Sequence, residues 1–260
     1  AKPLRVRLKP SDFESHVYTR GCPGCRAILR KGRPVSHSGQ CRSRMEELLS
    51  NSDAGRKRKQ VADGRINSYF AERIEQAIKQ LVDIDRTVRA LDLCAAPGGK
   101  STLVSSLLNE ESLLVSNEVI GSRYKILIEN MHKWGNSNQL IINHDVKDLG
   151  HLNGFFNLIL VDAPCSGEGL FRKDKKARSE WSENNVALCA ARQKRILAEA
   201  AELLAPDGIL IYSTCTYNEH ENEQNAAWIE ETLGLESQKI NTEKFPIGYL
   251  VIYMINLRMK

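Results

Sequence analysis

From residue 87 onward, short apolar runs alternate with stretches in which apolar residues recur at helical spacing. Short runs bounded by turn residues predict strands, and recurrence at every third or fourth position predicts amphipathic helices. The predicted strands cover residues 87–93, 113–116, 139–143, 156–162, 209–214 and 249–257, and the predicted helices cover residues 101–108, 123–134, 183–204 and 219–233. This alternation predicts an α/β fold, a doubly wound Rossmann-like sheet with helices on both faces.

The chain ahead of this pattern is organised differently. Residues 42–49 predict a short helix, and residues 66–81 predict an amphipathic helix that leads to the first strand. Between them, residues 50–59 form a polar and basic break, which we interpret as a linker. We therefore expect a small N-terminal segment with its linker over residues 1–60 and a globular domain over residues 61–260.

Charge is distributed unevenly along the chain. The first 80 residues hold 18 Lys+Arg and 8 Asp+Glu, while the remaining residues hold 19 and 24. A basic segment joined to a mildly acidic body favours a polyanionic partner, with a solvated tail as the alternative. No apolar run approaches the ~20 residues that a membrane span needs, and no apolar signal core opens the sequence. We expect a protein of the cytoplasm.

The seven cysteines favour free thiols or metal ligands in a reducing compartment over disulfides, because their number is odd and several stand in short motifs. Cys22-Pro-Gly-Cys25 is followed by His37-Ser-Gly-Gln-Cys41. Two cysteines on a turn, with a histidine and a cysteine on one helical turn, can supply the four corners of a tetrahedral zinc site. The alternative is four unconnected residues in a flexible tail. The segment faintly resembles Cys/His stretches of retroelement polyproteins, which implies no activity.

A strand, a tight turn and a helix start are predicted over Leu91-Asp-Leu-Cys-Ala-Ala-Pro-Gly-Gly-Lys-Ser101. Gly98 and Gly99 permit the turn, and free N–H groups at the helix start suit an anionic or carboxylate-bearing cofactor. Glu118 follows the second strand, where a doubly wound nucleotide site places an acid for ribose hydroxyls; a solvated loop acid is the alternative. A phosphate-binding loop is disfavoured because Cys94 occupies its first glycine position, and the dinucleotide glycine pattern is absent from the sequence.

Two more cysteines end neighbouring predicted strands. Cys165 follows the fourth strand together with Asp162, and Cys215 follows the fifth. If these strands pair, their tips lie ~5 Å apart and both thiols can face one site. Each cysteine alone would more often be a buried apolar residue, as we expect for Cys189 inside a helix. Together with a carboxyl group that can hydrogen-bond a heterocycle, they favour covalent chemistry.

Three motifs carry a resemblance to a known family. They are Leu91-Asp-Leu-Cys-Ala-Ala-Pro-Gly-Gly-Lys100, Val161-Asp-Ala-Pro-Cys-Ser-Gly-Glu-Gly-Leu-Phe-Arg-Lys173 and Tyr212-Ser-Thr-Cys-Thr-Tyr-Asn-Glu-His-Glu-Asn222. In this order they resemble the RNA 5-methylcytosine methyltransferases that use S-adenosylmethionine, most closely the bacterial ribosomal RNA branch. The resemblance covers about residues 88–233 and implies the fold already expected. It also implies an RNA partner, ribosomal RNA first and tRNA second.

The resemblance further implies roles for single residues. Those that would line the S-adenosylmethionine site are Cys94, Ala95, Ala96, Pro97, Gly98, Gly99, Lys100, Glu118, Asp145 and Asp162. Of these, Glu118 would bind the ribose and Asp145 would lie near the adenine. Cys215 would be the nucleophile that adds to C6 of cytosine, Cys165 would assist product release, and Asp162 would also contact the base. Because the base must leave any stack, single-stranded or flipped-out RNA is the expected substrate.

Residues 1–75 depart from the family pattern. Members of the family carry an RNA-binding segment and a Gln-acid-x-Ser-Ser pattern ahead of the first strand, and this sequence shows neither. The stretch after Leu233 is also short for a further RNA-binding domain. Two other functions therefore stay open: binding of cofactor or nucleic acid without turnover, and methylation of cytosine in DNA, whose enzymes use a Pro-Cys motif that Pro164-Cys165 fits. The Thr-Cys element at Cys215 favours RNA.

Overall fold

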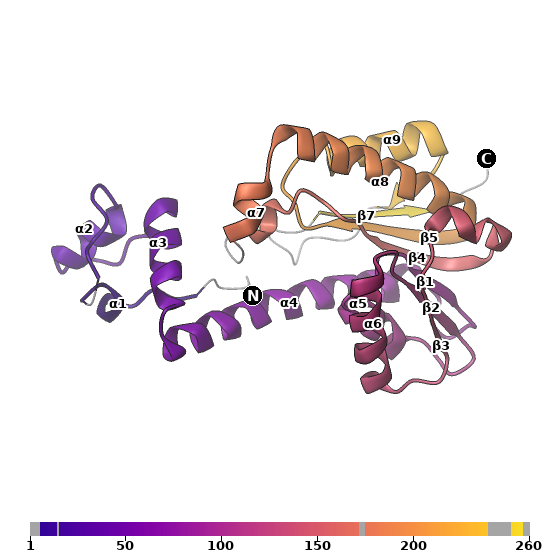
Figure 1. Ribbon diagram of the computed structural model, residues 1–260, viewed down its shortest axis with the longest axis horizontal. Helices are drawn as coiled ribbons and strands as arrows, with labels where there is room; N and C mark the ends of the chain where they lie inside the picture. Colours follow the sequence, from indigo (N-terminus) through magenta and orange to yellow (C-terminus); the bar gives the residue numbers. More distant parts are fainter. Residues whose placement is uncertain (1–5, 15, 172–174, 239–250, 257–260) are drawn as a thin grey trace. The chain divides into compact units, whose positions relative to one another are not determined.

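The computed structural model describes residues 6–14, 16–171, 175–238 and 251–256. The chain divides into two compact units, an N-terminal unit over residues 1–72 and a C-terminal unit over residues 73–260 (Figure 1). The ends of the predicted last strand, at 249–250 and 257, and the last two residues of the second motif, 172–173, lie outside the described residues. Within the described ranges, no helix is long and apolar enough to cross a membrane.

Short helices build the N-terminal unit: α1 (Pro10–Glu14), α2 (Pro23–Leu29), α3 (Gly39–Leu49) and the first part of α4 (Asp53–Leu81). Pro23 opens α2, where its missing N–H is not needed. Ser38 caps α3 by accepting a hydrogen bond from the Cys41 N–H at 3.3 Å. The buried apolar residues of this unit form two small clusters: Phe13, Cys22, Cys25, Cys41 and Met45, and Val6, Leu49 and Ala62.

Helix α4 occupies most of the stretch that the sequence pattern predicts as a linker, residues 50–59, so that prediction of a break is wrong from its fourth residue onward. The Ser52 hydroxyl accepts a hydrogen bond from the Gly55 N–H at 3.1 Å, which caps the helix start. Lys and Arg are good helix formers, so a basic run without proline stays helical. Arg58 in this run pairs with Asp12 of α1 at 2.7 Å. The expected domain boundary falls inside α4, as does the division between the units, and stays a prediction.

A seven-stranded sheet forms the centre of the C-terminal unit, in the order β3-β2-β1-β4-β5-β7-β6. The strands are β1 (Arg89–Asp92), β2 (Leu113–Asn117), β3 (Gln139–Ile142), β4 (Phe156–Asp162), β5 (Leu204–Thr214), β6 (Glu236–Gln238) and β7 (Val251–Asn256). The first five are parallel, and β7 runs antiparallel to β5. The predicted doubly wound α/β sheet is confirmed. Strand order reverses between β1 and β4, where such sheets bind ligands at the carboxyl ends of the strands.

Helices cover both faces of this sheet. One face carries α5 (Gly99–Leu107), α6 (Gly121–Trp134) and residues 73–81 of α4; the other carries α8 (Glu183–Leu203), α9 (Glu223–Leu233) and the 3-10 helix η1 (Val146–Leu152) (Figure 1). Successive residues of a strand point to opposite faces. In β4, Leu158 and Leu160 accordingly pack with the first set of helices, and Ile159 and Val161 with the second. Two short helices, η2 (Glu168–Leu170) and α7 (Lys175–Glu180), follow β4.

Strand β5 begins ahead of its predicted start at residue 209. The sequence Pro206-Asp207-Gly208, which predicts a turn, lies inside the strand. Asp207 has a φ of 60°, and the pairing with β4 shifts register between Phe156 and Leu158. The turn residues therefore make a local irregularity in the strand and do not end it.

Candidate active site

Cys165 and Cys215 meet at the carboxyl ends of β4 and β5. The two strands pair in parallel, with Asp162 opposite Ser213. Just beyond this pair of residues, Cys165 Sγ lies 3.1 Å from Cys215 Sγ. The expectation that pairing of these strands would bring the two thiols to one site is confirmed.

The two thiols differ in their protonation. A hydrogen bond from the Cys165 thiol, helped by the positive charge of Lys100, lowers the pKa of Cys215 against the opposing effects of burial and of the Asp162 carboxylate. The same hydrogen bond, together with burial, raises the pKa of Cys165. Cys215 is also the exposed member of the pair, whereas Cys165 is half-buried. The thiolate form is therefore favoured at Cys215 and the protonated thiol at Cys165.

Hydrogen bonds join the two loops that carry these cysteines. The hydroxyls of Ser166 and Thr216 lie 3.1 Å apart. The Gly169 N–H donates to the Cys215 carbonyl oxygen at 2.8 Å. A Cβ atom at position 169 would clash with that backbone oxygen, so the close approach requires glycine. The loop that follows β4 thus fixes the backbone of Cys215.

The Glu168 carboxylate strengthens the same connection. It accepts hydrogen bonds from Trp181 Nε1 at 3.1 Å, from the Tyr217 N–H at 3.2 Å and from Asn218 Nδ2 at 3.3 Å. Two of these donors belong to the loop after β5, two and three residues beyond Cys215. Hydrogen bonds to a charged group are stronger than neutral ones, so this carboxylate holds the loop firmly.

A buried network fixes the backbone on both sides of Cys165. Glu221 Oε1 accepts hydrogen bonds from the Ser166 N–H and from Gln193 Nε2, both at 2.9 Å. Gln193 Nε2 also donates to the Pro164 carbonyl oxygen at 2.9 Å. Since Gln193 and Glu221 are fully buried, breaking one contact would leave its partner without water to replace it.

Asp162 joins this cysteine pair to the turn after β1. Its Oδ2 lies 2.5 Å from Lys100 Nζ on the first turn of α5, and its Oδ1 accepts a hydrogen bond from the Ser213 hydroxyl at 2.9 Å. The side chains of Asp162 and Lys100 are each about one-third exposed. They are therefore held in place but within reach of a bound molecule.

The turn between β1 and α5 holds residues 94–100, which the resemblance places at the cofactor. Gly98 caps α5 with a φ of 109°, a backbone conformation that glycine adopts readily. The first turn of a helix carries N–H groups without intrahelical partners, so the start of α5 can bind an anionic group. Burial raises the pKa of the Cys94 thiol, which keeps that thiol neutral.

Asp92 ends β1 beneath this turn and is almost fully buried. Its Oδ2 accepts a hydrogen bond from the Ser101 hydroxyl at 2.7 Å, whereas its Oδ1 has no hydrogen-bond partner. Burial, partly offset by the Ser101 hydrogen bond, raises the pKa of Asp92 to about 6. A buried carboxylate oxygen without a donor is unusual in a folded protein and points to a missing partner.

Glu118 has a second oxygen of this kind. Its Oε1 accepts a hydrogen bond from the Ile120 N–H at 2.9 Å. Its Oε2 lies 3.3 Å from Arg123 Nη1, an ion pair by distance, but has no donor in hydrogen-bond geometry. Asp145 is half-buried and caps η1 by accepting a hydrogen bond from the Lys147 N–H at 3.4 Å. The oxygens on Asp92 and Glu118 that accept no hydrogen bond fit a cofactor that brings hydroxyl or amine donors, as S-adenosylmethionine does.

Several residues of the site are not singled out by the sequence pattern. Asp92 and Asn117 are the last residues of β1 and β2, within one residue of the predicted strand ends, and Glu168 and Glu221 stand within the motifs, so their positions could have drawn attention to them. Asn117 links three strand ends, because its Nδ2 donates to the carbonyl oxygens of Leu93 and His144 at 3.3 and 3.0 Å. Gln193 lies in the middle of a helix and gives no such signal.

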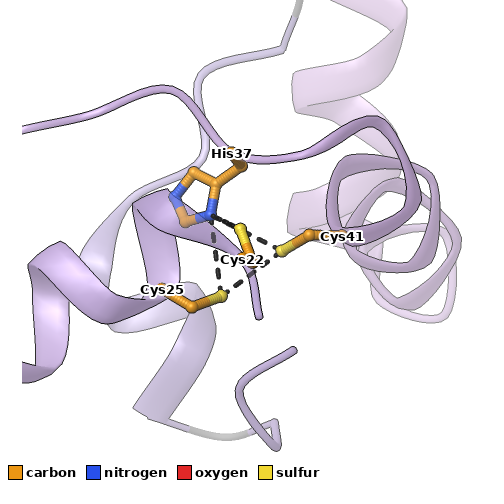
Figure 2. A group of neighbouring side chains, drawn as sticks. All are labelled: Cys22, Cys25, His37 and Cys41. Atoms are coloured by element: carbon orange, nitrogen blue, oxygen red, sulfur yellow. Dashed lines mark hydrogen bonds between the residues drawn. The ribbon is translucent and has the colours of Figure 1, made fainter. Parts of the chain in front are cut away.

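The four predicted metal ligands meet in the N-terminal unit. One ligand atom from each of Cys22, Cys25, His37 and Cys41 lies within 4.8 Å of all the others (Figure 2). They could bind a metal ion. Cys189, expected in the core, is buried in α8.

Known proteins resemble the C-terminal unit. Residues 79–247 match the family described as 16S rRNA methyltransferase RsmB/F. Ribosomal RNA small subunit methyltransferase F of Pectobacterium atrosepticum is 44% identical over 141 residues, which cover 54% of this chain and 29% of that protein. The chain thus spans less than a third of the length of this curated relative.

Two crystal structures from Pyrococcus horikoshii share the fold. NSun6 with SFG has a TM-score of 0.59 at 23% identity, covering 68% of this chain and 50% of that chain. A methyltransferase homolog protein has a TM-score of 0.55 at 25% identity, covering 66% and 62%. The family match begins at the end of α4 and runs through every parallel strand of the sheet. The chain therefore belongs to the 16S rRNA methyltransferase RsmB/F family.

Proposed function

We propose that this chain transfers a methyl group from S-adenosylmethionine to C5 of a cytosine in RNA, through a covalent bond between Cys215 and C6 of the base. The thiol pair carries the proposal. Cys215 Sγ lies 3.1 Å from Cys165 Sγ, and the two pKa values are shifted in opposite directions. One thiolate that attacks and one thiol that keeps its proton are the two groups that covalent addition and release require.

Residues at the ends of β1, β2 and β3 would hold S-adenosylmethionine. The turn of residues 94–100 and the start of α5 would bind its amino-acid end, Glu118 its ribose hydroxyls, and Asp145 would lie near the adenine. The unpartnered oxygens of Asp92 and Glu118 support this placement, because the cofactor brings the donors that they lack. When bound, the cofactor supplies an electrophilic methyl group.

Cys215 would start the reaction on the base. Its thiolate adds to C6 of cytosine, an S–C bond forms, and the electron pair of the C5=C6 double bond makes C5 nucleophilic. Once C5 carries the methyl group, transfer of the C5 proton to a water molecule and cleavage of the S–C bond restore the double bond and release the thiolate. Exposure of Cys215 lets a base reach its sulfur.

Cys165 and Asp162 would act beside this sulfur. The Cys165 thiol keeps its proton, so it can donate a hydrogen bond to the departing Cys215 thiolate and assist product release. Asp162, held by Lys100 and Ser213, would contact the cytosine. Asp162 thus connects the base with the turn that would hold the cofactor.

RNA is the proposed substrate class. The name of the Pectobacterium relative favours small-subunit ribosomal RNA, and tRNA is the second choice. A cytosine must leave its stack to reach Cys215, which an unpaired or flipped-out base does at the lowest cost. All seven cysteines are free, which supports a reducing compartment such as the cytoplasm.

A labelled-methyl assay tests the proposal. The full chain is incubated with S-adenosylmethionine carrying a labelled methyl group and with small-subunit ribosomal RNA, tRNA or DNA. Cys215→Ala is expected to lower methyl transfer by at least roughly a thousandfold, because it removes the nucleophile. Cys165→Ala is expected to accumulate a protein–RNA adduct that withstands denaturation. Cys189→Ala, a buried cysteine away from the pair, serves as the matched control and should retain activity.

Other outcomes would contradict parts of the proposal. An adduct in Cys215→Ala and none in Cys165→Ala would reverse the two roles. Transfer to DNA alone would favour the DNA methyltransferase, and cofactor binding without any transfer would favour the binding function. The pH profile gives an independent check: Cys165→Ala removes the hydrogen bond that lowers the pKa of Cys215, so the acid limb of the adduct-formation rate should move to higher pH.

A further inference from the structure

The geometry of the N-terminal unit points to a second site, unrelated to methyl transfer. We propose that Cys22, Cys25, His37 and Cys41 bind one zinc ion through three sulfur atoms and His37 Nδ1, and that this ion stabilises the fold of the N-terminal unit. The four ligand atoms face one another around a common centre (Figure 2). Four protein ligands fill a tetrahedral shell and leave no open position, so the site is structural and not catalytic.

The distances between the ligand atoms match a zinc tetrahedron. With zinc bonds of about 2.3 Å to sulfur and about 2.0 Å to nitrogen, a tetrahedron separates sulfur from nitrogen by about 3.5 Å and two sulfurs by about 3.8 Å. His37 Nδ1 lies 3.4 Å from Cys22 Sγ, 3.7 Å from Cys25 Sγ and 3.5 Å from Cys41 Sγ. Cys25 Sγ and Cys41 Sγ lie 3.4 Å apart. All the ligand atoms lie within 4.8 Å of one another, so a movement of at most about 1 Å would bring them to the tetrahedral separations.

The identity of the histidine nitrogen follows from the surroundings of the ring. Phe13 stacks on the His37 ring, with the ring centres 4.6 Å apart and an angle of 10° between the planes. The ring also lies close to Gly24, where an added Cβ atom would lie 2.6 Å from ring atoms. The ring is thus clamped with Nδ1 toward the three sulfurs. Clamping of a ligand ring by its neighbours is common in metal sites and favours binding.

The local helices deliver the cysteines to the site. Cys22 lies at the N-cap of α2 and Cys25 on its first turn, while Cys41 lies on the first turn of α3. His37 precedes the Ser38 cap, so it is not on one helical turn with Cys41, which corrects that detail of the sequence prediction. The Ser38 N–H donates to Cys22 Sγ at 3.3 Å, a hydrogen bond that supports negative charge on the sulfur.

The small buried core of the N-terminal unit is the reason why we expect it to need an ion. Three of the five buried residues in its larger cluster, as far as the structure describes it, are proposed ligands. Phe13 and Met45 are the other two, and the partly buried side chains that pack against the cluster are Leu8, Tyr18, Ile28 and Leu48. A core of this size supplies too little apolar burial to fix three helices, and small domains compensate with disulfides or metals. One disulfide would use two of the four groups and leave a cysteine and a histidine without a role. A zinc ion uses all four.

Three sulfurs and one imidazole nitrogen also restrict the choice of metal. Calcium and magnesium prefer oxygen ligands, whereas a tetrahedral sulfur and nitrogen set is typical of zinc. Iron can also bind to such a ligand set, and elemental analysis of the purified chain distinguishes iron from zinc. Zinc bound by thiolates is redox-inert, which suits a structural role.

Metal analysis of the purified full chain tests the proposal. We expect one zinc per chain, and after exchange with cobalt we expect visible absorption bands of tetrahedral Co²⁺ and a thiolate charge-transfer band. Cys25→Ser and His37→Gln should each weaken zinc binding by roughly a hundredfold or more, since every ligand contributes to the total binding free energy. Cys189→Ser is the matched control, because this buried cysteine lies in the other unit, and it should leave the stoichiometry unchanged.

A second measurement, alkylation of the cysteines in the wild-type chain, tests the proposal even if the variants do not fold. In the wild-type chain, zinc should protect Cys22, Cys25 and Cys41 from alkylation, and a chelator should expose all three together. Chains that hold no zinc after purification with added zinc, or thiols that react equally with and without it, would overturn the proposal. So would iron in place of zinc, or a Cys25–Cys41 disulfide found by mass spectrometry under reducing purification. None of these results depends on methyl transfer.

Discussion

The N-terminal unit is built around Phe13, Met45 and three cysteines, whereas the C-terminal unit encloses its sheet between two apolar layers. In the first unit the polar and sulfur groups are themselves part of the core. In the second the core consists mainly of aliphatic side chains, and the carboxylates and thiols of the candidate site lie at the carboxyl ends of the strands. The cysteines of the N-terminal unit therefore lie inside its core, whereas Cys165 and Cys215 of the C-terminal unit lie at the ends of strands.

The difference shows how core size relates to the use of cysteine. A large sheet is held by apolar burial alone, so Cys165 and Cys215 can lie at its edge, where one of them is exposed. The small N-terminal unit buries far less apolar surface, and its Cys22, Cys25 and Cys41 are all buried. We therefore propose that the same residue type serves chemistry in one unit and stability in the other. The following predictions test this comparison.

The largest effect is expected from metal removal. Structural zinc contributes on the order of 10–16 kcal/mol in small metal-binding domains, comparable to the whole stability of a domain. A chelator should therefore unfold the N-terminal unit, and hydrogen exchange should show lost protection in α2 and α3 while β4 and β5 keep theirs. Unchanged protection of α2 and α3 in chains shown to be metal-free would contradict the comparison.

A cavity in the C-terminal core should have the next largest effect. Ile159 is fully buried in the centre of β4, so Ile159→Ala should destabilise this unit by roughly 2–5 kcal/mol. All three tryptophans, Trp134, Trp181 and Trp228, lie in the C-terminal unit, and their fluorescence during urea unfolding measures it separately. Leu188 is 66% exposed, and Leu188→Ala should change little. Equal effects of the two variants would contradict the described core.

Ionisation of Asp92 should make stability depend on pH. Its pKa in the folded chain is about 6, above the usual value of about 3.9, so the stabilisation is complete below pH ~4 and is lost as the pH rises through about 6. Asp92→Asn cannot ionise and keeps an oxygen for Ser101. The variant should be more stable than wild type by up to about 3 kcal/mol at pH 8, with the difference shrinking toward pH 4. Urea unfolding across this range measures it, and a pH-independent difference would refute the burial effect.

The smallest effect is expected at Gly169. A Cβ atom at this position would displace the carbonyl of Cys215, so Gly169→Ala should lower the methyl-transfer rate about tenfold, equivalent to about 1.4 kcal/mol. The rate constant kcat should fall while the KM for S-adenosylmethionine stays the same, because the change misplaces the nucleophile. A Cβ atom at Gly150 would meet nothing within 4 Å, which makes Gly150→Ala the control. Equal rates for both variants would show that the contact does not position Cys215.

Parts of the site follow from the sequence because strand order determines them. Cys165 is the third residue after β4 and Cys215 the first after β5, and these strands pair in parallel, so the meeting of the two thiols could be predicted from the sequence. Which of them carries the proton could not, because this depends on the direction of one S–H bond and on the distance to Lys100. The buried contacts of Gln193 were likewise hidden, since a polar residue inside a helix is usually at the surface.

The N-terminal unit shows more clearly that composition alone predicts local structure poorly. The charge of the basic run at residues 50–59 predicts a linker. Charge does not prevent a helix from forming, however, and Arg58 in this run pairs with Asp12. The ligand spacing does predict the cluster of Cys22, Cys25, His37 and Cys41 correctly, because two close pairs on short turns can meet with little loop closure. Only the structure shows that His37 Nδ1 faces the sulfurs and that Phe13 stacks on the His37 ring, because ligand spacing reveals neither contact.

The sequence by itself determined the doubly wound sheet, the order of its parallel strands along the chain and the residues at their carboxyl ends, because hydrophobic period and turn residues are local properties. Only the tertiary structure decided which thiol has the lower pKa, which carboxylate oxygens accept no hydrogen bond and how Gly169 holds Cys215. These depend on distances of a few ångströms between segments that are far apart in the chain. Burial and hydrogen bonding set protonation and position, and both arise only when those segments pack together.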